Sequence, residues 1–402
     1  MDKRQFSLAA VALAASVAAA PAFAKGQYDA GADDKEIKIG NIMPYSGPAS
    51  AYGVIGKVMA GYFKMINEKG GVNGRKINFV SLDDGYSPPK TVEQARKLVE
   101  QEEVLFLFGT LGTPTNSAIH KYMNQKKVPQ LFVTTGATKW ADPKGYPWTM
   151  GWQPNYQGEG RIYAEYILDK VPDAKIGILY QNDDYGKDYL HGLEAGLGDK
   201  AKTLIVKKLS YETTDPTIDS QILELQASGA NVFYNVTTPK FAAQAIKKIA
   251  AIGWKPVHLL NSVSSSVGSV LKPAGLENSK GVISVQYMKD PTDPAWANEP
   301  DFKEYAAFLK KYVPDANITD SLAVIGYAAS YSLIQVLKQS GDNLTRANVM
   351  KQAASLNIPV HPMMLPGVGI KTAADDFSPV EKEQMIRFNG TTYERFGKVY
   401  GR

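Results

Sequence analysis

The chain has 402 residues, of which 44% are hydrophobic and 21% charged, and its formal net charge is +5. This composition is typical of a folded globular protein, and the length predicts two domains rather than one. So small a charge, with no cluster of Lys and Arg among aromatic residues, argues against nucleic-acid binding, and the lack of cysteine excludes thiol catalysis, thiolate metal sites and disulfides.

The first 24 residues have the pattern of a secretory signal peptide. A charged start, Asp2-Lys3-Arg4, precedes an Ala-rich apolar run over residues 6–20, and Ala22-Phe-Ala24 matches the A-x-A cleavage signal. A short membrane anchor is the alternative, but the run falls short of the ~20 apolar residues that span a bilayer. We therefore expect cleavage after Ala24 and a periplasmic mature protein that begins at Lys25.

Strands and helices alternate through the first half of the chain. A first helix ends at Gly70-Gly71, and a second follows Pro88-Pro89 with the capping-box pattern Thr91-Val-Glu-Gln94. A third helical pattern begins near Ile119. Short apolar runs predict strands over residues 37–43, 77–82, 104–108 and 130–133. This alternation is typical of a doubly wound parallel sheet.

The same alternation restarts after Gly151. Helices are expected over 157–169 and 217–226, with another opened by Pro239, and strands over 176–180, 204–209, 232–234 and 257–260. Further helices are expected over 301–312, 321–339 and 345–355, and Asn389-Gly390 predicts a hairpin between 385–388 and 391–396. The fold class is therefore α/β, with two doubly wound units in succession.

The stretch from Val104 to Ala118 contains the first candidate binding site. A short apolar strand runs into Gly109 and Gly112, and Thr113 and other hydroxyl residues follow just before a helix. Free backbone N–H groups at a helix start, together with hydroxyls, can bind a small anion such as a carboxylate. An ordinary βα loop with a capped helix would have a similar sequence.

Other polar loops follow strands in both halves. Ligands of open α/β sheets bind at the carboxyl ends of the strands, so two such sheets facing each other would form a cleft. Its expected lining is Tyr45, Ser46, Tyr52, Gly112, Thr113, residues 134–138, Asp184, Tyr185, residues 237–240, Asn261 and Ser262.

Several motifs occur together in an informative order. They are the leader, Ile39-Gly-Asn-Ile-Met-Pro-Tyr-Ser-Gly47, Ile66-Asn-Glu-Lys-Gly-Gly-Val-Asn-Gly74, Asp83-Asp84, and the loops at 109–113, 136–138 and 184–186. With these motifs, nearly all of residues 35–402 resemble the type I periplasmic solute-binding proteins of ABC importers, in the Leu/Ile/Val-binding branch. The resemblance implies two lobes that close on a ligand around three crossover segments, near Gly151, Val285 and Pro366. The first lobe would comprise residues 25–151 plus 286–366, and the second 152–285 plus 367–402.

The resemblance also implies particular ligand contacts. In amino-acid-binding members, the ligand carboxylate is held by a Ser or Thr and backbone N–H groups in one loop, and by a Gly or Ala and a Thr in the next. These positions correspond to Thr113, Gly136 and Thr138, and the aromatic residue after the second lobe's first strand corresponds to Tyr185. The predicted ligand-binding set is completed by Tyr52, Gly112, Ala137, Lys240 and Asn261. Each could instead be an ordinary loop hydroxyl, backbone position or packed side chain.

Lys240 departs from the family pattern. Amino-acid binders usually carry an acidic residue just after a Pro at this helix start, where it pairs with the ligand's ammonium group, but this sequence reads Thr237-Thr-Pro-Lys240. If Lys240 lines the cleft, an α-amino acid should bind poorly, because like charges repel in a buried site. If Lys240 points to solvent, then Asp183, Asp184 or Glu159 could hold the ammonium.

The expected function is therefore that of an extracytoplasmic solute-binding protein that delivers a small hydrophobic or aromatic carboxylate to a membrane permease. We expect a monomer with no nucleic-acid partner, and no metal or cofactor, since the four histidines lack metal-ligand spacing. Branched-chain or other hydrophobic amino acids are the alternative ligands, and presentation of the ligand to a sensor is an alternative role. An exported enzyme is disfavoured, because adjacent residues such as Asp83 and Asp84 on an extended chain point to opposite faces.

Overall fold

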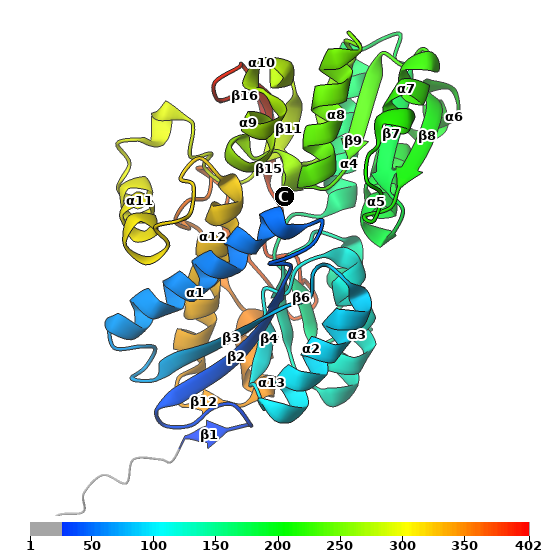
Figure 1. Cartoon of the computed structure of the whole chain (residues 1–402). Coiled ribbons are helices and arrows are strands. Elements are labelled where there is room, and N and C mark those ends of the chain that lie inside the picture. Colours follow the sequence, from blue (N-terminus) through cyan, green and yellow to red (C-terminus); the bar gives the residue numbers. More distant parts are fainter. Residues whose placement is uncertain (1–25, 402) are drawn as a thin grey trace, which may run out of the picture.

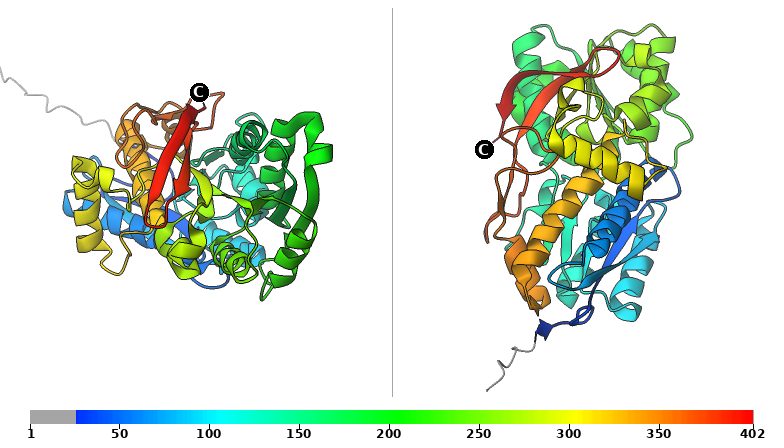
Figure 2. Two further views of the ribbon diagram at one scale, coloured as in Figure 1. Left: turned by 90° about the horizontal axis from the view of Figure 1, so that it is seen from above. Right: turned by 90° about the vertical axis from the view of Figure 1, so that its left-hand side faces the viewer.

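The computed structural model describes residues 26–401, so the predicted signal peptide, residues 1–24, lies outside the described residues. The chain forms two α/β lobes, and the second lies above the first in Figure 1. Each lobe has its own sheet, and the turned views in Figure 2 show the chain passing between the lobes. The expected two-lobe α/β fold is confirmed.

The first lobe is built on a five-stranded sheet of order β3-β2-β4-β5-β6, in which all neighbours are parallel. Its strands are β2 (Glu36–Met43), β3 (Lys76–Asp83), β4 (Phe106–Phe108), β5 (Gln130–Val133) and β6 (Thr149–Gly151). The strands β4 and β5 are buried throughout, as expected of apolar runs covered on both faces. The helices of this βα succession are α1 (Gly53–Glu68), α2 (Pro88–Arg96) and α3 (Thr113–Lys126).

A later part of the chain returns to complete the first lobe. The long helix α12 (Ser321–Ser340) packs along α1, and a Cβ on Gly326 would lie only 2.6 Å from the carbonyl oxygen of Ile55. This close approach explains a glycine in the middle of a helix. The other elements of this part are α11 (Pro300–Tyr312), β12 (Asn343–Leu344), α13 (Arg346–Ala353), β13 (Asn357–Ile358) and β14 (Ile370–Lys371).

The second lobe is built on a seven-stranded sheet of order β16-β15-β11-β10-β9-β7-β8. Its strands are β7 (Ile176–Gln181), β8 (Ile205–Tyr211), β9 (Val232–Val236), β10 (Val257–Leu260), β11 (Ile283–Gln286), β15 (Glu383–Phe388) and β16 (Tyr393–Tyr400). Its helices are α4 (Tyr156–Lys170), α5 (Asp184–Leu197), α6 (Ala201–Leu204), α7 (Asp219–Ala227), α8 (Pro239–Ala251), α9 (Lys272–Ala274) and α10 (Leu276–Ser279). The last two strands form an antiparallel hairpin around Asn389-Gly390, drawn in red in Figure 2.

The chain crosses between the lobes three times. The first crossing joins β6 to α4, and the second follows β11. The third was expected near Pro366, but Val368, Ile370, Phe377 and Val380 still pack in the core of the first lobe. We therefore propose that the third crossing lies between Val380 and β15.

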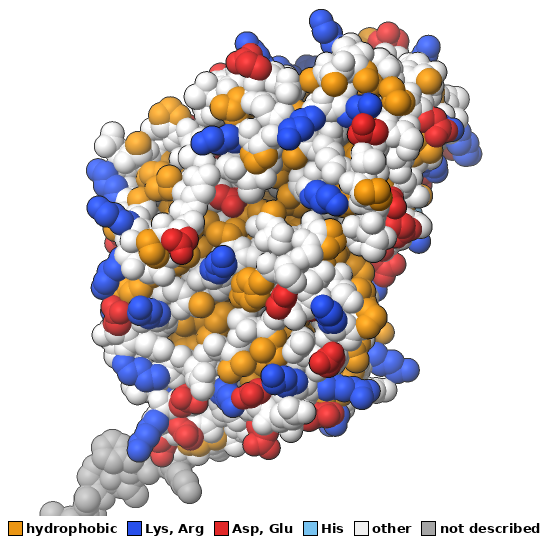
Figure 3. Space-filling model, viewed as in Figure 1, with side chains coloured by type: hydrophobic (Ala, Val, Ile, Leu, Met, Phe, Trp, Pro, Cys, Tyr) orange, Lys and Arg blue, Asp and Glu red, His pale blue; other side chains and the backbone are white. Residues whose placement is uncertain are grey.

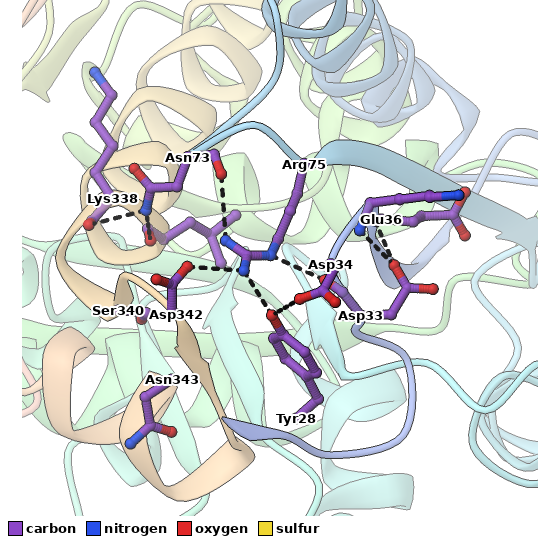
Figure 4. Close-up of polar contacts among 12 residues, drawn as sticks. Tyr28, Asp33, Asp34, Glu36, Asn73, Arg75, Lys338, Ser340, Asp342 and Asn343 are labelled. Atoms are coloured by element: carbon purple, nitrogen blue, oxygen red, sulfur yellow. Dashed lines mark hydrogen bonds and ion pairs between the residues drawn. The ribbon is translucent and has the colours of Figure 1, made fainter. Parts of the chain in front are cut away.

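The start of the described chain is anchored far from the lobe interface. Arg75, only 5% exposed, donates to Tyr28 Oη (2.7 Å), to an Asp342 carboxylate oxygen (2.8 Å) and to the Asp33 carbonyl (2.9 Å) (Figure 4). This guanidinium joins β1 (Gln27–Tyr28) to the loop before β3 and to the end of α12. The short parallel pairing of β1 with β12 strengthens the same junction.

Polar contacts hold the two lobes together. In the loop after β5, the Thr138 N–H and hydroxyl both donate to one oxygen of Asp188 on α5, at 2.8 and 2.9 Å, and Lys139 pairs with Asp184 (2.8 Å). On α12, Asp320 caps the helix and accepts hydrogen bonds from the hydroxyls of Ser266 and Ser269 of the second lobe. The lobes are therefore in direct contact on both sides of the interface.

The surface carries no large field of one charge sign on the face shown in Figure 3, where basic and acidic side chains are mixed over both lobes. Within residues 26–401, no helix combines the length and apolar character that a membrane crossing requires.

Candidate functional site

A small cavity lies where the two lobes meet. Side chains from β-strand ends and helix starts of both lobes form its wall, and α12 contributes Ile325. The cavity has a volume of about 20 Å³, which is enough for about one water molecule. Its lining residues are Tyr52, Ile55, Tyr86, Leu111, Gly112, Thr113, Thr134, Gln153, Tyr156, Tyr185, Thr238, Val263 and Ile325.

The start of α3 forms one end of this cavity. Gly112 is the N-cap and has a φ of 96°, which a residue with a side chain rarely adopts, and no side chain caps the helix. The Thr113 hydroxyl is shared with the Thr135 hydroxyl at 2.6 Å. Backbone N–H groups, a helix dipole and a hydroxyl pair therefore meet at one point of the wall, which favours a small anion there.

Tyrosine rings form much of the remaining wall. Tyr156 stacks on Tyr189 with ring centres 4.3 Å apart, and Tyr185 donates its hydroxyl to the Thr237 carbonyl at 3.2 Å. Tyr52 lies close to Ser264 of the second lobe, whose hydroxyl donates to the Thr237 carbonyl. Burial raises the pKa of all three hydroxyls, so they stay neutral and act as hydrogen-bonding groups on an otherwise apolar wall.

The cavity has no charged side chain in its wall, as far as residues 26–401 are concerned. Its most polar feature is Gln153, whose side-chain carbonyl oxygen is buried without a hydrogen-bond partner while its amide nitrogen donates to Tyr287 at 3.4 Å. An unsatisfied buried acceptor has a cost of about 1–3 kcal/mol, which a donor group on a ligand would remove.

The cavity brings together four residues of the predicted ligand-binding set: Tyr52, Gly112, Thr113 and Tyr185. Gly136, Ala137 and Thr138 lie outside its wall. Gly136 is needed because a Cβ there would collide with the Pro154 carbonyl and the Tyr156 ring. The Thr138 hydroxyl and N–H are both taken by Asp188, so this threonine joins the lobes instead of facing the cavity.

Lys240 and Asn261 also lie outside the cavity wall. Lys240 is exposed, with its ammonium 4.7 Å from the Phe241 ring centre and 3.4 Å from the Asp215 carbonyl, and it borders a surface groove between the lobes. Asn261 is fully buried and donates to the carbonyls of Asn235 and Thr237 (3.1 and 2.9 Å), which holds the loop after β10. Lys240 does not line the cavity, so its position gives no support to the idea that it excludes amino acids there.

The three carboxylates that were alternative partners for a ligand ammonium group are bonded to other groups. Glu159 accepts from the Ser262 N–H and hydroxyl and from the hydroxyls of Tyr163 and Tyr189. Asp183 caps α5, and Asp184 pairs with Lys139. These three acidic residues lie outside the wall of the cavity, and their bonds organise the second lobe and its junction with the first.

Asp83 and Asp84 shape the turn after β3 and have no arrangement for acid–base chemistry. Asp83 accepts from the backbone of Tyr45 and Gly85, and Asp84 accepts from the Tyr86 N–H and the Thr91 hydroxyl. Helix α2 begins at Pro88 with Ser87 as its N-cap, so Thr91 lies three residues inside the helix. The capping box predicted at Thr91 is therefore wrong.

The wall residues that sequence reasoning missed include Ile55, Tyr86, Gln153, Val263 and Ile325. A signal was available for Tyr86, since it lies just beyond the carboxyl end of a strand, two residues after Asp84. Gln153 lies in the first crossover, next to Trp152. Ile325 comes from α12, and nothing in its local sequence indicates that this helix reaches the cleft.

Other hollows are less suited to an enclosed ligand. A second small cavity, about 30 Å³, adjoins the first through Gln153, Val263 and Ile325, and its Lys289 is paired with Asp301 at 2.7 Å. A much larger hollow, about 780 Å³, is a solvent-open groove between α4 and the segment before β15. Side chains of both charge signs line that groove, so it lacks the apolar lining that a hydrophobic ligand needs.

Comparison with known proteins agrees with this geometry. The family model described as "Periplasmic binding protein" matches residues 36–389. A curated relative named Leu/Ile/Val-binding protein homolog 1, from Brucella suis, is 26% identical over 317 residues, which cover 77% of this chain and 80% of the relative.

Solved structures show the same fold. A branched-chain amino acid ABC transporter structure from Thermus thermophilus, with bound valine, superposes with a TM-score of 0.82 at 16% identity and covers 94% of this chain and 97% of its own. A fatty acid ABC transporter substrate-binding protein from Thermomonospora curvata gives a TM-score of 0.79 at 22% identity, covering 94% and 95%.

Proposed function

This chain belongs to the periplasmic binding protein family, whose members bind solutes and are not enzymes, and we propose that it binds a small hydrophobic carboxylate in the cleft between its lobes. It would then be the extracytoplasmic component of an ABC importer and would present this ligand to a membrane permease. The observation that carries the proposal is the interlobe cavity, with an uncapped helix start at one end and uncharged tyrosine and aliphatic walls elsewhere.

The start of α3 supports a carboxylate as the polar end of the ligand. A negative charge at a helix N-terminus is stabilised by about 0.3–1 kcal/mol, and by up to ~2 kcal/mol when partly buried. Micromolar binding needs ~8 kcal/mol, so most of the affinity has to come from burial of an apolar body at ~25 cal/mol per Å². The aliphatic and aromatic walls supply that surface.

The uncharged wall supports a ligand without an amine. A buried ammonium needs a carboxylate partner, and its desolvation without one has a cost of several kcal/mol. Within the described residues the lining contains no acidic side chain. The family resemblance also implies that the exposed Lys240 takes the place of an acid found in amino-acid-binding members. Because Lys240 is outside the cavity, an amine is disfavoured by the missing carboxylate and not by repulsion from the lysine.

Hydrophobic amino acids are the second candidate ligands. The unpartnered Gln153 carbonyl oxygen could accept from an ammonium group, and neutral tyrosine hydroxyls could accept beside it. The names of the Brucella and Thermus proteins, which refer to branched-chain amino acids, support the same alternative by analogy.

A thermal-shift screen with matched pairs separates the two candidates. Residues 25–402 are mixed with leucine or 4-methylpentanoate, and with phenylalanine or 3-phenylpropanoate, so that each pair differs only in the amine. Stabilisation by the acids supports the proposal, and stabilisation by the amino acids alone supports the second candidate. No shift with any of the four would contradict both.

A further inference from the structure

Tyr86 occupies an unusual position in the loop between β3 and α2. It has a φ of 62° and follows Gly85, whose φ is 56°, so two successive residues are in the left-handed region. For a residue with a side chain this conformation costs roughly 1–2 kcal/mol. The Asp84 carboxylate holds the turn by accepting from the Tyr86 N–H at 2.9 Å. This turn directs the Tyr86 ring into the cleft, where it is only 7% exposed.

The ring covers the start of α3. A Cβ built on Gly112 would lie 2.5 Å from Tyr86 Cε2 and 3.2 Å from Cζ, so the ring edge packs directly on the N-cap backbone. This is the same point at which the helix dipole, the backbone N–H groups and the Thr113 hydroxyl favour an anion. A carboxylate and the Tyr86 ring would therefore compete for adjoining space.

The ring also reaches the second lobe. Burial raises the pKa of the Tyr86 hydroxyl, and the Gln181 side chain at the end of β7 lies close enough to lower it in part. The Gln181 amide donates to Asp183 (2.5 Å) and accepts from the Tyr211 hydroxyl (3.0 Å), so its orientation is well determined. Tyr86 thus lies against the second lobe while it fills the cleft.

The size of the cavity requires that part of its wall can move. Space for about one water cannot hold valine or any larger carboxylate. Tyr52, Tyr156 and Tyr185 belong to helical turns, and Tyr156 and Tyr185 are further held by the Tyr189 ring and the Thr237 carbonyl. Of the four lining tyrosines, Tyr86 alone stands on an irregular loop with a left-handed backbone, so it is the ring that can leave at the lowest cost.

We propose that Tyr86 is the displaceable wall of the ligand site: its ring covers the start of α3, leaves when a ligand enters, and limits the ligand to a group of about its own size. This inference rests on the proposed function, since it concerns the same cleft. It narrows the substrate class to carboxylates whose apolar part resembles a phenyl ring or a branched aliphatic chain.

The first test needs no ligand. Amide hydrogen exchange is measured over residues 109–118 in the wild-type mature protein and in the Tyr86→Ala and Tyr86→Phe variants. Removal of the ring should accelerate exchange at the start of α3 by roughly tenfold, about 1.4 kcal/mol of protection. Tyr86→Phe should retain the wild-type protection, because it keeps the ring. Unchanged exchange in Tyr86→Ala would overturn the inference.

The second test measures binding of 3-phenylpropanoate by calorimetry. Tyr86→Ala should bind this acid roughly tenfold more tightly than wild type, because no buried ring has to be displaced. Tyr185→Ala is the matched control, since it removes a ring of the same size from a held position, and it should bind more weakly. If Tyr86→Ala loses affinity as Tyr185→Ala does, Tyr86 is an ordinary wall residue and the inference is wrong.

The two tests distinguish a failure of the proposed ligand class from a failure of the inference about Tyr86. If the acid binds to none of the three proteins, the proposed ligand class is contradicted, while faster exchange in Tyr86→Ala would still support the cover over α3. Thermal unfolding of each variant shows that it is folded under the assay conditions.

Discussion

Thr113 and Thr138 distinguish a residue that faces the cavity from one that holds the lobes together. Both were expected to bind a ligand carboxylate, and both are threonines near a helical turn. In the structure Thr113 lines the cavity with its hydroxyl next to Thr135, whereas Thr138 gives its hydroxyl and N–H to Asp188. Position relative to the cavity, and not residue type, separates their roles.

Substitution of these two threonines should therefore have different effects. Thr113→Val removes a hydrogen bond to a charged ligand group, worth about 1.5 kcal/mol, and should weaken binding of 3-phenylpropanoate roughly tenfold. It also removes the bond to the Thr135 hydroxyl and should lower stability by about 1 kcal/mol. Titration calorimetry gives the affinity, and thermal unfolding gives the stability.

Thr138→Val is the matched control. It should mainly reduce the stability of the closed arrangement, because it removes one of the two bonds to Asp188. If Thr138→Val weakened ligand binding more than Thr113→Val, the carboxylate site would lie at the loop after β5 and not at the start of α3.

Some site residues could be predicted from sequence because local pattern determines them. Gly112 and Thr113 follow an apolar strand and precede a helix, and Tyr185 follows the N-cap Asp183. The orientations of Lys240 and Thr138 could not be predicted, because each depends on a partner far away in the sequence. Ile325 enters the cavity only through the packing of α12 on α1.

At the scale of elements, periodicity predicted most strands and helices to within a few residues. The strand expected over 130–133 is β5 at the same bounds, and the helix expected over 321–339 is α12. Helix α5 is 14 residues long, but its sequence opens with Asp183-Asp-Tyr-Gly186, which predicts a loop. Strands β6 and β11 are short, and their pairing partners determine them more than their own composition does.

The junction around Arg75 is a structural element whose loss should affect stability only. Arg75→Ala leaves Tyr28, Asp342 and the Asp33 carbonyl without their donor and should lower the free energy of unfolding by about 2–3 kcal/mol. Arg75→Lys should recover only part of this, because an ammonium lacks the planar fork that reaches several acceptors. Urea unfolding measures the change.

The neighbouring exposed Lys76 is the control for Arg75, and its substitution by alanine should change stability by less than ~0.5 kcal/mol. The affinity for 3-phenylpropanoate should be the same in all three variants. If Arg75→Ala is fully folded but binds the acid more weakly than wild type, the junction is energetically coupled to the ligand site in the cleft.

At the scale of the whole molecule, a pair of buried carboxyls lies near the third crossing. Glu383, at the start of β15, is 4% exposed, and one of its oxygens has no hydrogen-bond partner. Burial, and then the nearby Glu159, raise the pKa of Glu383 well above its usual value. Burial raises the pKa of Glu159 as well, but four hydrogen-bond donors offset part of that rise, so Glu383 is the carboxyl of the pair that holds a proton more readily.

This proton should make stability depend on pH. The folded state keeps a proton on Glu383 that the unfolded chain loses above pH ~4.3. The contribution of Glu383 to the free energy of unfolding is therefore fully present below that pH. It decreases as the pH rises towards the folded-state pKa of Glu383. Glu383→Gln removes the group, and its stability should fall less steeply than that of wild type between pH 4.5 and 8. Thermal unfolding across this range measures the difference.

Glu165→Gln is the control for this pH effect, because Glu165 is exposed on α4 and paired with Lys398 at the surface. Its pH profile should run parallel to that of wild type. Equal slopes for wild type and Glu383→Gln would mean that Glu383 is ionised in the folded protein.

The two-lobe architecture itself followed from the succession of βα units, since two sheets of this kind place their loops on a common cleft. What the sequence could not provide was the state of that cleft. The contacts of Thr138 with Asp188 and of Asp320 with Ser266 and Ser269 close the lobes on each other, and the cavity volume and the place of Tyr86 follow from this closure.

The central claim is that the cleft prefers a hydrophobic carboxylate without an amine, and the most direct test is calorimetric titration of 3-phenylpropanoate and phenylalanine into residues 25–402. The account predicts that the acid binds at least roughly tenfold more tightly, since the cavity wall offers no carboxylate to an ammonium. Tighter binding of phenylalanine would contradict the account and would indicate that Gln153 and the tyrosine hydroxyls hold the ammonium.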